Sequence, residues 1–267
     1  MTIDQELSLR LAVALQAARE ASGLILEYYQ TDDIGLESKS DATPVTAADR
    51  GAEKLLRERL NAAFPEDGVL GEEFDDYPAK NGYRWILDPI DGTKSFVAGV
   101  PLFGTLMGLE HEGEAVLGVC RFPGLDEVMY AVKCQGAWWQ KGAGRPKRAR
   151  VSTVSELGEA IYCLTGMEGY QKTDRMDVFE AFRTQARLCR GWGDCYGHML
   201  VATGRAEVIT DPLMSPWDAA ALVPILQEAG GVFLSWDGQP TAHGGSGFSC
   251  NAALKDQVLE IVRPKST

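Results

Sequence analysis

The sequence predicts an α/β protein in two parts: an α+β N-terminal part with a mixed or antiparallel sheet, then an α/β C-terminal part. Apolar residues recur at helical spacing at the start of the chain, and strand-like runs joined by short turns follow. Further along, short apolar strands alternate with helical segments. The composition changes to Gly, Pro, Lys and Arg over residues 141–150. We therefore predict domains over residues 1–145 and 146–267.

Two helices open the N-terminal part. The spacing of apolar residues predicts an amphipathic helix from Asp4 to about Tyr29, and a polar loop over residues 37–49 leads into a second helix that continues through Leu60. Thr46 is placed to cap this second helix, and Asp49 lies in its first turn, where the helix dipole favours a carboxylate. Taken alone, Asp49 is a helix-stabilising residue.

Strands follow the helices. A short strand over residues 69–73 ends in Glu72 and Glu73. A second short buried strand over residues 85–87 is expected to end at Asp88-Pro89, because proline cannot donate to a strand ladder. Residues 101–110 and 114–121 predict two strands joined by a turn, and residues 128–132 and 136–140 predict another hairpin.

The second half alternates strands and helices. We expect strands over residues 160–164, 186–190, 206–210 and 231–235, and helices over residues 175–185, 198–203, 219–229 and 255–262. Asp218 directly precedes the helix over residues 219–229. It is therefore either a carboxylate that interacts with the helix dipole or a metal ligand.

Composition excludes several classes of function. The net charge of −12 argues against general nucleic-acid binding, which relies on Lys and Arg. The sequence shows neither a secretory signal nor a membrane span, so we expect no membrane association. Six cysteines are scattered without a C-x-x-C pair, which disfavours zinc and redox motifs and predicts reduced thiols in a cytoplasm.

The stretch Trp85–Phe96 carries the strongest chemical signal. Asp88 and Asp91 lie three residues apart around an expected turn, so that both carboxylates and the Ile90 carbonyl can face one hard cation, which prefers oxygen ligands. Backbone N–H groups at Gly92-Thr93 would suit a phosphate. An acidic surface turn is the alternative. The spacing differs from the D-x-D-G-T motif of aspartyl phosphatases, and Gly99 stands at the twelfth position, where a calcium loop needs glutamate.

Four motifs in order resemble the inositol monophosphatase superfamily of metal-dependent phosphatases. They are Gly71-Glu72-Glu73, Asp88-Pro89-Ile90-Asp91-Gly92-Thr93, Trp217-Asp218 followed by Ala219-Ala220, and Glu228-Ala229-Gly230-Gly231, and the loop from Lys39 to Asp49 is similar as well. The resemblance covers nearly the whole chain. It implies a layered αβαβα sandwich of the sugar-phosphatase type and a homodimer.

The resemblance also implies residue roles. Two or three Mg²⁺ ions would be held by Glu72, Asp88, Asp91, Asp218 and the Ile90 carbonyl. Thr93 and Asp49, with Glu72, would orient and deprotonate the attacking water, and the N–H groups of Gly92 and Thr93 would hold phosphate oxygens. Lys39 is a further candidate for substrate binding.

Within the superfamily, the C-terminal half is most similar to the histidinol-phosphate phosphatase branch. The residues that carry this similarity are Trp192-Gly193-Asp194-Cys195-Tyr196-Gly197, the run Leu200–Glu207, and Asp211-Pro212 before Ser215-Pro216-Trp217-Asp218. Asp194 could pair with a substrate ammonium or imidazolium. Its alternative role is that of a structural carboxylate paired with Arg190, which is itself a candidate for substrate binding.

The resemblance therefore implies a Mg²⁺-dependent phosphatase whose substrate is a small phosphorylated metabolite. L-histidinol phosphate, hydrolysed to L-histidinol in histidine biosynthesis, is the first candidate. An inositol monophosphatase or a broad sugar-phosphate phosphatase is the second, since it shares every metal ligand. A non-catalytic, metal-stabilised binding protein on the same scaffold is a third.

Overall fold

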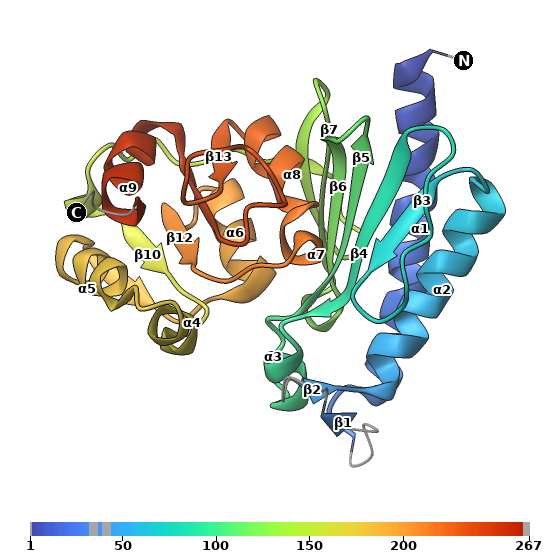
Figure 1. Cartoon of the computed structure of the whole chain (residues 1–267), viewed down its shortest axis with the longest axis horizontal. Helices are drawn as coiled ribbons and strands as arrows, with labels where there is room; N and C mark the ends of the chain where they lie inside the picture. The colour runs from blue at the N-terminus through green and yellow to red at the C-terminus, as the bar shows by residue number, and fades with distance from the viewer. Residues whose placement is uncertain (1, 32–36, 39–43, 264–267) are drawn as a thin grey trace.

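The computed structural model describes residues 2–31, 37–38 and 44–263 as five alternating layers of helices and sheets (Figure 1). The outermost helices on one side are α1 (Ile3–Tyr28) and α2 (Ala47–Ala63), which pack against a seven-stranded sheet. Helices α6 (Asp194–Ala202), α7 (Pro216–Ala219) and α8 (Leu222–Glu228) separate this sheet from a five-stranded one. Helices α4 (Met167–Lys172), α5 (Met176–Gln185) and α9 (Lys255–Val262) lie on the far side. The predicted αβαβα sandwich is confirmed.

The first sheet is mixed, as expected. Its strands follow one another in space in chain order: β3 (Gly68–Gly71), β4 (Tyr83–Asp91), β5 (Gly104–His111), β6 (Glu114–Phe122), β7 (Glu127–Val132), β8 (Gly136–Lys141) and β9 (Lys147–Arg148). Only the pair β3 and β4 is parallel. A separate two-stranded sheet pairs β1 (Glu37–Ser38) with β2 (Pro44–Val45). The sheet thus extends into the segment where we predicted the domain boundary, and the division into two domains stays a prediction.

Strand β4 is buried on both faces and belongs to two cores. Trp85 and Leu87 pack toward α1 and α2, whereas Ile86 packs toward α8 and the second sheet. Successive side chains of a strand point to opposite faces, so this continuous apolar run suits a strand between two helical layers. Because β4 ends at Asp91, its last residues emerge from the middle of the sandwich.

One expectation about β4 was wrong. The strand does not end at Asp88-Pro89 but continues to Asp91. Its pairing with β5 shifts register between Asp88 and Asp91, so Pro89 lies in an irregularity of the ladder where no N–H is needed. The Pro89 carbonyl accepts a hydrogen bond from Thr105 Oγ1 at 2.8 Å. This irregularity changes the direction in which the carboxylates at the strand end point.

The second sheet has the order β11 (Leu188–Arg190), β10 (Ile161–Cys163), β12 (Val208–Asp211), β14 (Gly247–Asn251) and β13 (Gly231–Leu234). The first three strands are parallel, and β14 is antiparallel to both of its neighbours. This half therefore has the α/β arrangement that the alternation of strands and helices predicted. Strand β14 was not predicted, since it follows the Gly-rich segment at residues 244–247.

The helix predicted over residues 219–229 is also different. It is divided into α7, which contains Trp217 and Asp218, and α8. Pro224 cannot donate to the carbonyl of Ala220, four residues earlier, and its ring crowds that carbonyl, which explains the break. Helix α7 begins with Ser215 at its N-cap, and the Asp218 carboxylate accepts from the Ser215 N–H at 2.7 Å.

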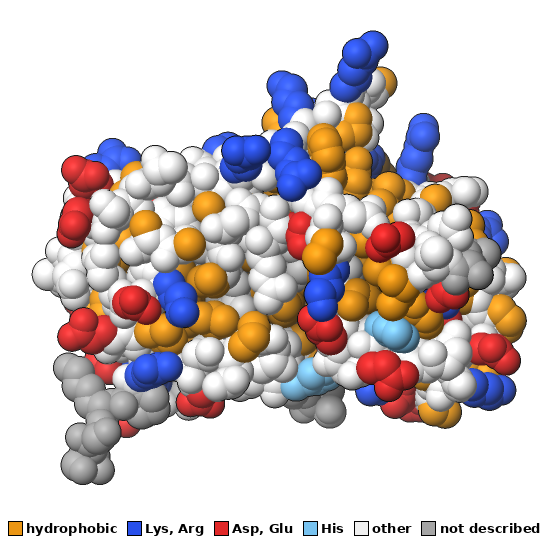
Figure 2. All heavy atoms as spheres, turned by 90° about the horizontal axis from the view of Figure 1, so that it is seen from above, with side chains coloured by type: hydrophobic (Ala, Val, Ile, Leu, Met, Phe, Trp, Pro, Cys, Tyr) orange, Lys and Arg blue, Asp and Glu red, His pale blue; other side chains and the backbone are white. Residues whose placement is uncertain are grey.

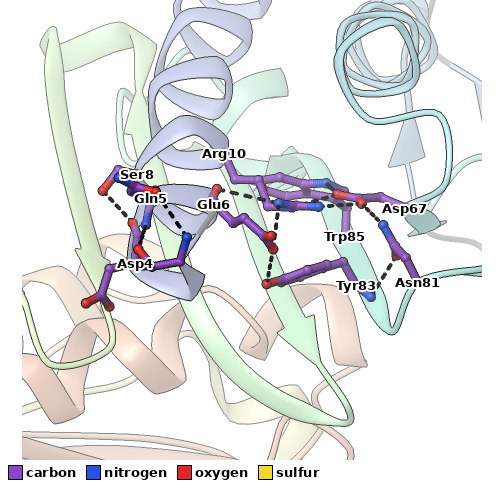
Figure 3. A network of polar contacts seen from close by, with 10 residues as sticks. Asp4, Gln5, Glu6, Ser8, Arg10, Asp67, Asn81, Tyr83 and Trp85 are labelled. Atoms are coloured by element: carbon purple, nitrogen blue, oxygen red, sulfur yellow. Dashed lines mark hydrogen bonds and ion pairs between the residues drawn. The ribbon is translucent and has the colours of Figure 1, made fainter.

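A buried polar network joins α1 to the first sheet (Figure 3). The Arg10 guanidinium donates from Nη2 and Nε to Asp67 at 2.8 and 3.0 Å and lies 3.7 Å from the centre of the Tyr83 ring. Trp85 Nε1 and Asn81 Nδ2 donate to the same carboxylate at 3.0 and 2.8 Å. Each buried charge is therefore paired and hydrogen-bonded, which locks the helix layer onto β4.

Figure 2 shows Lys and Arg side chains standing out along one edge of the molecule, the upper edge in that view. The basic run Arg145, Lys147, Arg148 and Arg150 is exposed, and the Arg148 guanidinium lies 5.4 Å from the centre of the Trp138 ring. These side chains therefore face the solvent. Among the described residues, no helix is both long and apolar enough to span a membrane.

Candidate active site

A cleft of about 830 Å³ opens where β4 and β12 end, and it collects most of the residues singled out in the sequence. From the first sheet and the segments around it come Glu72, Asp88, Ile90, Asp91, Gly92 and Thr93, and from the second half come Asp194, Asp211 and Asp218. Helix α3 (Thr93–Val97) begins at this edge, with Gly92 at its N-cap in the left-handed conformation (φ 81°). A residue with a side chain would be strained at that position.

Three carboxylates meet at the floor of the cleft. One oxygen from each of Asp88, Asp91 and Asp218 lies within 4.8 Å of the others, and Asp88 is buried. Asp88 Oδ1 has no hydrogen-bond partner among the described residues. A buried carboxylate oxygen without a donor calls for a cation, and three hard oxygen donors around one point suit Mg²⁺. The residues therefore fit the divalent metal that the sequence suggested.

Burial and mutual repulsion perturb these acids strongly. Burial, followed by the charges of Glu72, Asp91 and Asp218, raises the pKa of Asp88 well above its usual range. Burial likewise raises the pKa of Asp91, and it raises that of Asp218 to about 7. The cluster cannot hold all its negative charges at neutral pH unless positive charge is supplied. A bound cation would supply it and displace the protons.

Glu72 lies beside this cluster on the loop after β3. A residue that was not predicted, Glu53 of α2, holds this loop: its buried carboxylate accepts from the Glu73 N–H at 2.8 Å and pairs with Arg57 Nε at 2.7 Å. A Cβ on Gly71 would overlap Glu53 Oε1. A larger residue at position 71 would therefore force the Glu53 carboxylate to move.

Asp49 and Thr93, expected to act together on water, each have a different partner. The Asp49 carboxylate accepts from the Thr46 N–H at 2.8 Å and from Thr46 Oγ1, which completes a capping box on α2. Burial raises the pKa of Asp49 to about 6. Thr93 Oγ1 donates to the Ile90 carbonyl at 3.1 Å. The helix-capping role of Asp49 is thus present, and Asp49 is not among the described residues that line the cleft.

Asp194 is the first residue of α6 and has a left-handed backbone (φ 50°), which non-glycine residues adopt rarely and which aspartate tolerates best. Thr165 Oγ1 accepts from its N–H at 2.8 Å, and Ser95 Oγ lies 3.5 Å from Asp194 Oδ2. Burial, followed by the charge of Asp211, raises the pKa of Asp194 to about 7. This strained residue is held with its carboxyl group in the cleft.

One candidate for substrate binding, Arg190, lies outside the cleft. The Arg190 side chain is exposed at the end of β11, and Nη1 donates to the Cys189 carbonyl at 2.8 Å. Arg190 does not line the cleft. An Asp194–Arg190 ion pair, the structural alternative for Asp194, is absent from the ion pairs of the described chain. Lys39 lies outside the described residues.

Asp211 was noted in the sequence as part of a pattern but was given no role. It ends β12, lines the cleft and is 8% exposed. The signal that could have found it is the pair Asp211-Pro212 after an apolar run, which repeats the sequence pair Asp88-Pro89. Carboxyl ends of strands are where such sheets place their functional groups.

Comparison with known proteins agrees with this geometry. The family model described as "Inositol monophosphatase family" matches residues 6–266. The chain is 46% identical to the histidinol-phosphatase of Chlorobaculum parvum over 94% of this chain and 96% of that protein. It is 38% identical to the histidinol-phosphatase of Mycobacterium tuberculosis, over 93% and 96% of the two chains.

Among solved structures, the extragenic suppressor protein SuhB of Bartonella henselae superposes with a TM-score of 0.87 at 25% identity. The superposition covers 97% of this chain and all of that one. The family predicted from the four motifs is confirmed, and its fold with it. This chain belongs to the inositol monophosphatase family.

Proposed function

We propose that this protein is a Mg²⁺-dependent phosphomonoesterase that hydrolyses L-histidinol phosphate to L-histidinol, a step of histidine biosynthesis. The observation that carries the proposal is the presence of two cleft carboxylates, Asp194 and Asp211, in addition to the cluster suited to a metal. A phosphate ester that also bears an ammonium group would neutralise them. The two relatives named histidinol-phosphatase, which align along nearly the whole chain, support the same substrate.

Two or three Mg²⁺ ions are proposed to bind Glu72, Asp88, Asp91, Asp218 and the Ile90 carbonyl. Asp88 Oδ1, which has no hydrogen-bond partner among the described residues, supports Asp88 as a residue that would hold a metal ion. Bound Mg²⁺ supplies the positive charge that offsets the phosphate and makes water a nucleophile near neutral pH. The backbone N–H groups of Gly92 and Thr93, at the start of α3, are proposed to donate to phosphate oxygens.

The chain's own groups would move the proton. Asp49, with a pKa of about 6, is largely ionised at neutral pH and can accept a proton from the attacking water; we propose it as the general base, with Glu72 and the Thr93 hydroxyl orienting that water. The new bond joins the water oxygen to phosphorus. The bond between phosphorus and the alcohol oxygen breaks, and the released alkoxide takes up a proton to give histidinol and inorganic phosphate.

The substrate cation is proposed to lie against Asp194, beside Ser95 and Asp211. An exposed Arg190 could approach the substrate only from outside the cleft, so its proposed contribution is secondary. Inositol phosphates are the second candidate substrates, because carboxylates also accept hydrogen bonds from polyol hydroxyls. A polyol would leave the carboxylates without a cation, which disfavours it.

The deciding experiment measures Mg²⁺-dependent phosphate release from histidinol phosphate, inositol 1-phosphate, fructose 1,6-bisphosphate and adenosine 3′,5′-bisphosphate side by side. We expect the highest kcat/KM on histidinol phosphate. A higher value on inositol 1-phosphate would overturn the substrate assignment and keep the phosphatase. Absence of phosphate release from every compound would favour the non-catalytic, metal-stabilised binding protein.

We further propose a cytoplasmic homodimer. All six cysteines are free thiols, and four of them are buried, which supports a reducing compartment. The homodimer rests on the resemblance to the superfamily. Light scattering coupled to size-exclusion chromatography tests it, and a mass equal to that of one 29.0 kDa chain would contradict it.

A further inference from the structure

A buried histidine supports the carboxylate at the end of β12. His198 is 1% exposed, and its Nε2 lies 3.1 Å from Asp211 Oδ2. On the other side of the ring, Nδ1 lies 2.7 Å from Ser249 Oγ, and Ser249 is fully buried on β14. An ionised carboxylate only accepts hydrogen bonds, so the Nε2–H donates to Asp211, and Nδ1 can accept from the serine hydroxyl. The imidazole thus connects β14 to the cleft.

Helix α6 carries one of the two carboxylates that face the proposed substrate cation, Asp194, and also His198, which contacts the other. Asp194 is the first residue of α6, and His198 follows four residues later, about one turn along the helix. Asp194 projects into the cleft directly, whereas His198 reaches it only through Asp211. Asp211 is also held through its neighbour, because Tyr170 Oη donates to the Thr210 carbonyl at 2.6 Å.

Two other roles for this arrangement fail on geometry. A serine, a histidine and an aspartate in a row resemble a hydrolytic triad, but Ser249 has no exposed surface from which to attack a substrate. Both ring nitrogens of His198 are occupied by Ser249 and Asp211, so neither points at the carboxylate cluster formed by Asp88, Asp91 and Asp218. Of these two partners of the ring, Asp211 is the one that lines the cleft.

We propose that His198 is a positioning residue for substrate selection: it orients Asp211 so that Asp194 and Asp211 together bind the cationic end of the substrate. This inference rests on the proposed function, because it assumes a substrate with an ammonium or imidazolium group. A residue that acts in this way affects the binding of a cationic phosphate ester. It leaves hydrolysis of a polyol phosphate, which carries no cationic group, nearly unchanged.

The test compares His198→Gln with His198→Met. The glutamine amide can reproduce the Nε2–H donor toward Asp211, whereas methionine fills the space without a donor. For His198→Met we expect KM for histidinol phosphate to rise roughly tenfold with kcat nearly retained, and kcat/KM for inositol 1-phosphate to change less than about twofold. His198→Gln should recover most of the loss in KM. Met199→Leu, a volume-conserving change at the next buried position of α6, serves as control.

Equal losses on both substrates, or no recovery in His198→Gln, would overturn the proposal and leave His198 as a structural residue. If His198→Met does not fold, Ser249→Ala decides, since it removes the hydroxyl behind the ring and should raise KM for histidinol phosphate alone. The wild-type protein separates this question from the proposed function. If the wild type does not prefer histidinol phosphate, the proposed function fails first, whatever the variants do.

Discussion

The backbone N–H of Cys195 donates to Asp91 Oδ2 at 2.6 Å, which joins residues 104 positions apart in the chain. Asp91 ends a strand of the first sheet, and Cys195 lies in the first turn of α6, which packs on the second. Carboxylates are stabilised at helix N-termini. The acidic cluster is therefore assembled only when the two sheets are in place, and its acids depend on both halves of the chain.

Asp88→Asn should reduce Mg²⁺-dependent phosphate release at least about a hundredfold, because it removes a proposed metal ligand and its charge. The variant should fold, since it loses a buried charge that has no hydrogen-bond donor at Oδ1. Phosphate release and circular dichroism measure the two effects. Asp256→Asn, an exposed change on α9, is the control. Near-normal turnover of Asp88→Asn would contradict the metal assignment.

The metal-free protein should lose stability as the pH rises. The pKa is about 6 for Asp49 and about 7 for Asp194 and Asp218, against an ordinary value of 3.8. Between about pH 4 and 7 the folded form then binds more protons than the unfolded form, so the free energy of unfolding falls as pH increases. One pKa unit corresponds to about 1.4 kcal/mol, or about 3 °C in Tm for a chain of this size.

Melting curves in chelator and in saturating Mg²⁺ measure this linkage. We expect Tm in chelator to be lower at about pH 8 than at about pH 5, and Mg²⁺ to raise Tm most at the higher pH, where binding displaces few protons. If Tm in chelator rises from pH 5 to pH 8, burial does not raise the pKa values of these carboxyl groups.

Asp194→Ala should weaken the binding of histidinol phosphate far more than the binding of inositol phosphate. It removes the carboxylate and also places alanine in the left-handed conformation. Asp194→Asn tolerates that conformation and removes only the charge, so it separates strain from recognition. We expect KM for histidinol phosphate to rise at least about tenfold in both variants. Equal losses on the two substrates in Asp194→Asn would refute the role in specificity.

Gly71→Ala should disturb the loop that carries Glu72. The added Cβ would overlap Glu53 Oε1 and displace the carboxylate that holds the Glu73 N–H. We expect the free energy of unfolding to fall by about 1–3 kcal/mol and Mg²⁺ to bind more weakly through Glu72. Calorimetry and Mg²⁺ titration of activity measure these changes. Gly158→Ala, where nothing lies within 4 Å of the new Cβ, should be neutral.

Local chemistry explains why much of the fold could be read from the chain. The apolar spacing of residues 4–29 predicted α1, and the Thr46 capping box marked the start of α2, because these signals act within a few residues. The motif from Asp88 to Thr93 identified a site because its donors lie next to one another in sequence. The family followed from the order of such motifs.

What failed depended on neighbours distant in sequence. Pro89 was expected to end its strand, as it would in a regular ladder of hydrogen bonds. The pairing of β4 with β5 is irregular at this point, so the strand continues through Pro89. Strand β14 pairs with β12 and with β13, and these pairings join it to segments distant in sequence.

The order of residues therefore determined which groups are present, the family, and the helices and strands whose signals are local. Tertiary structure decided which groups meet. It places Asp218 near Asp88 and Asp91 and leaves Arg190 outside the cleft. It also brings His198 between Asp211 and Ser249. The physical reason is that burial and the approach of like charges arise only when the two sheets close on the helices between them.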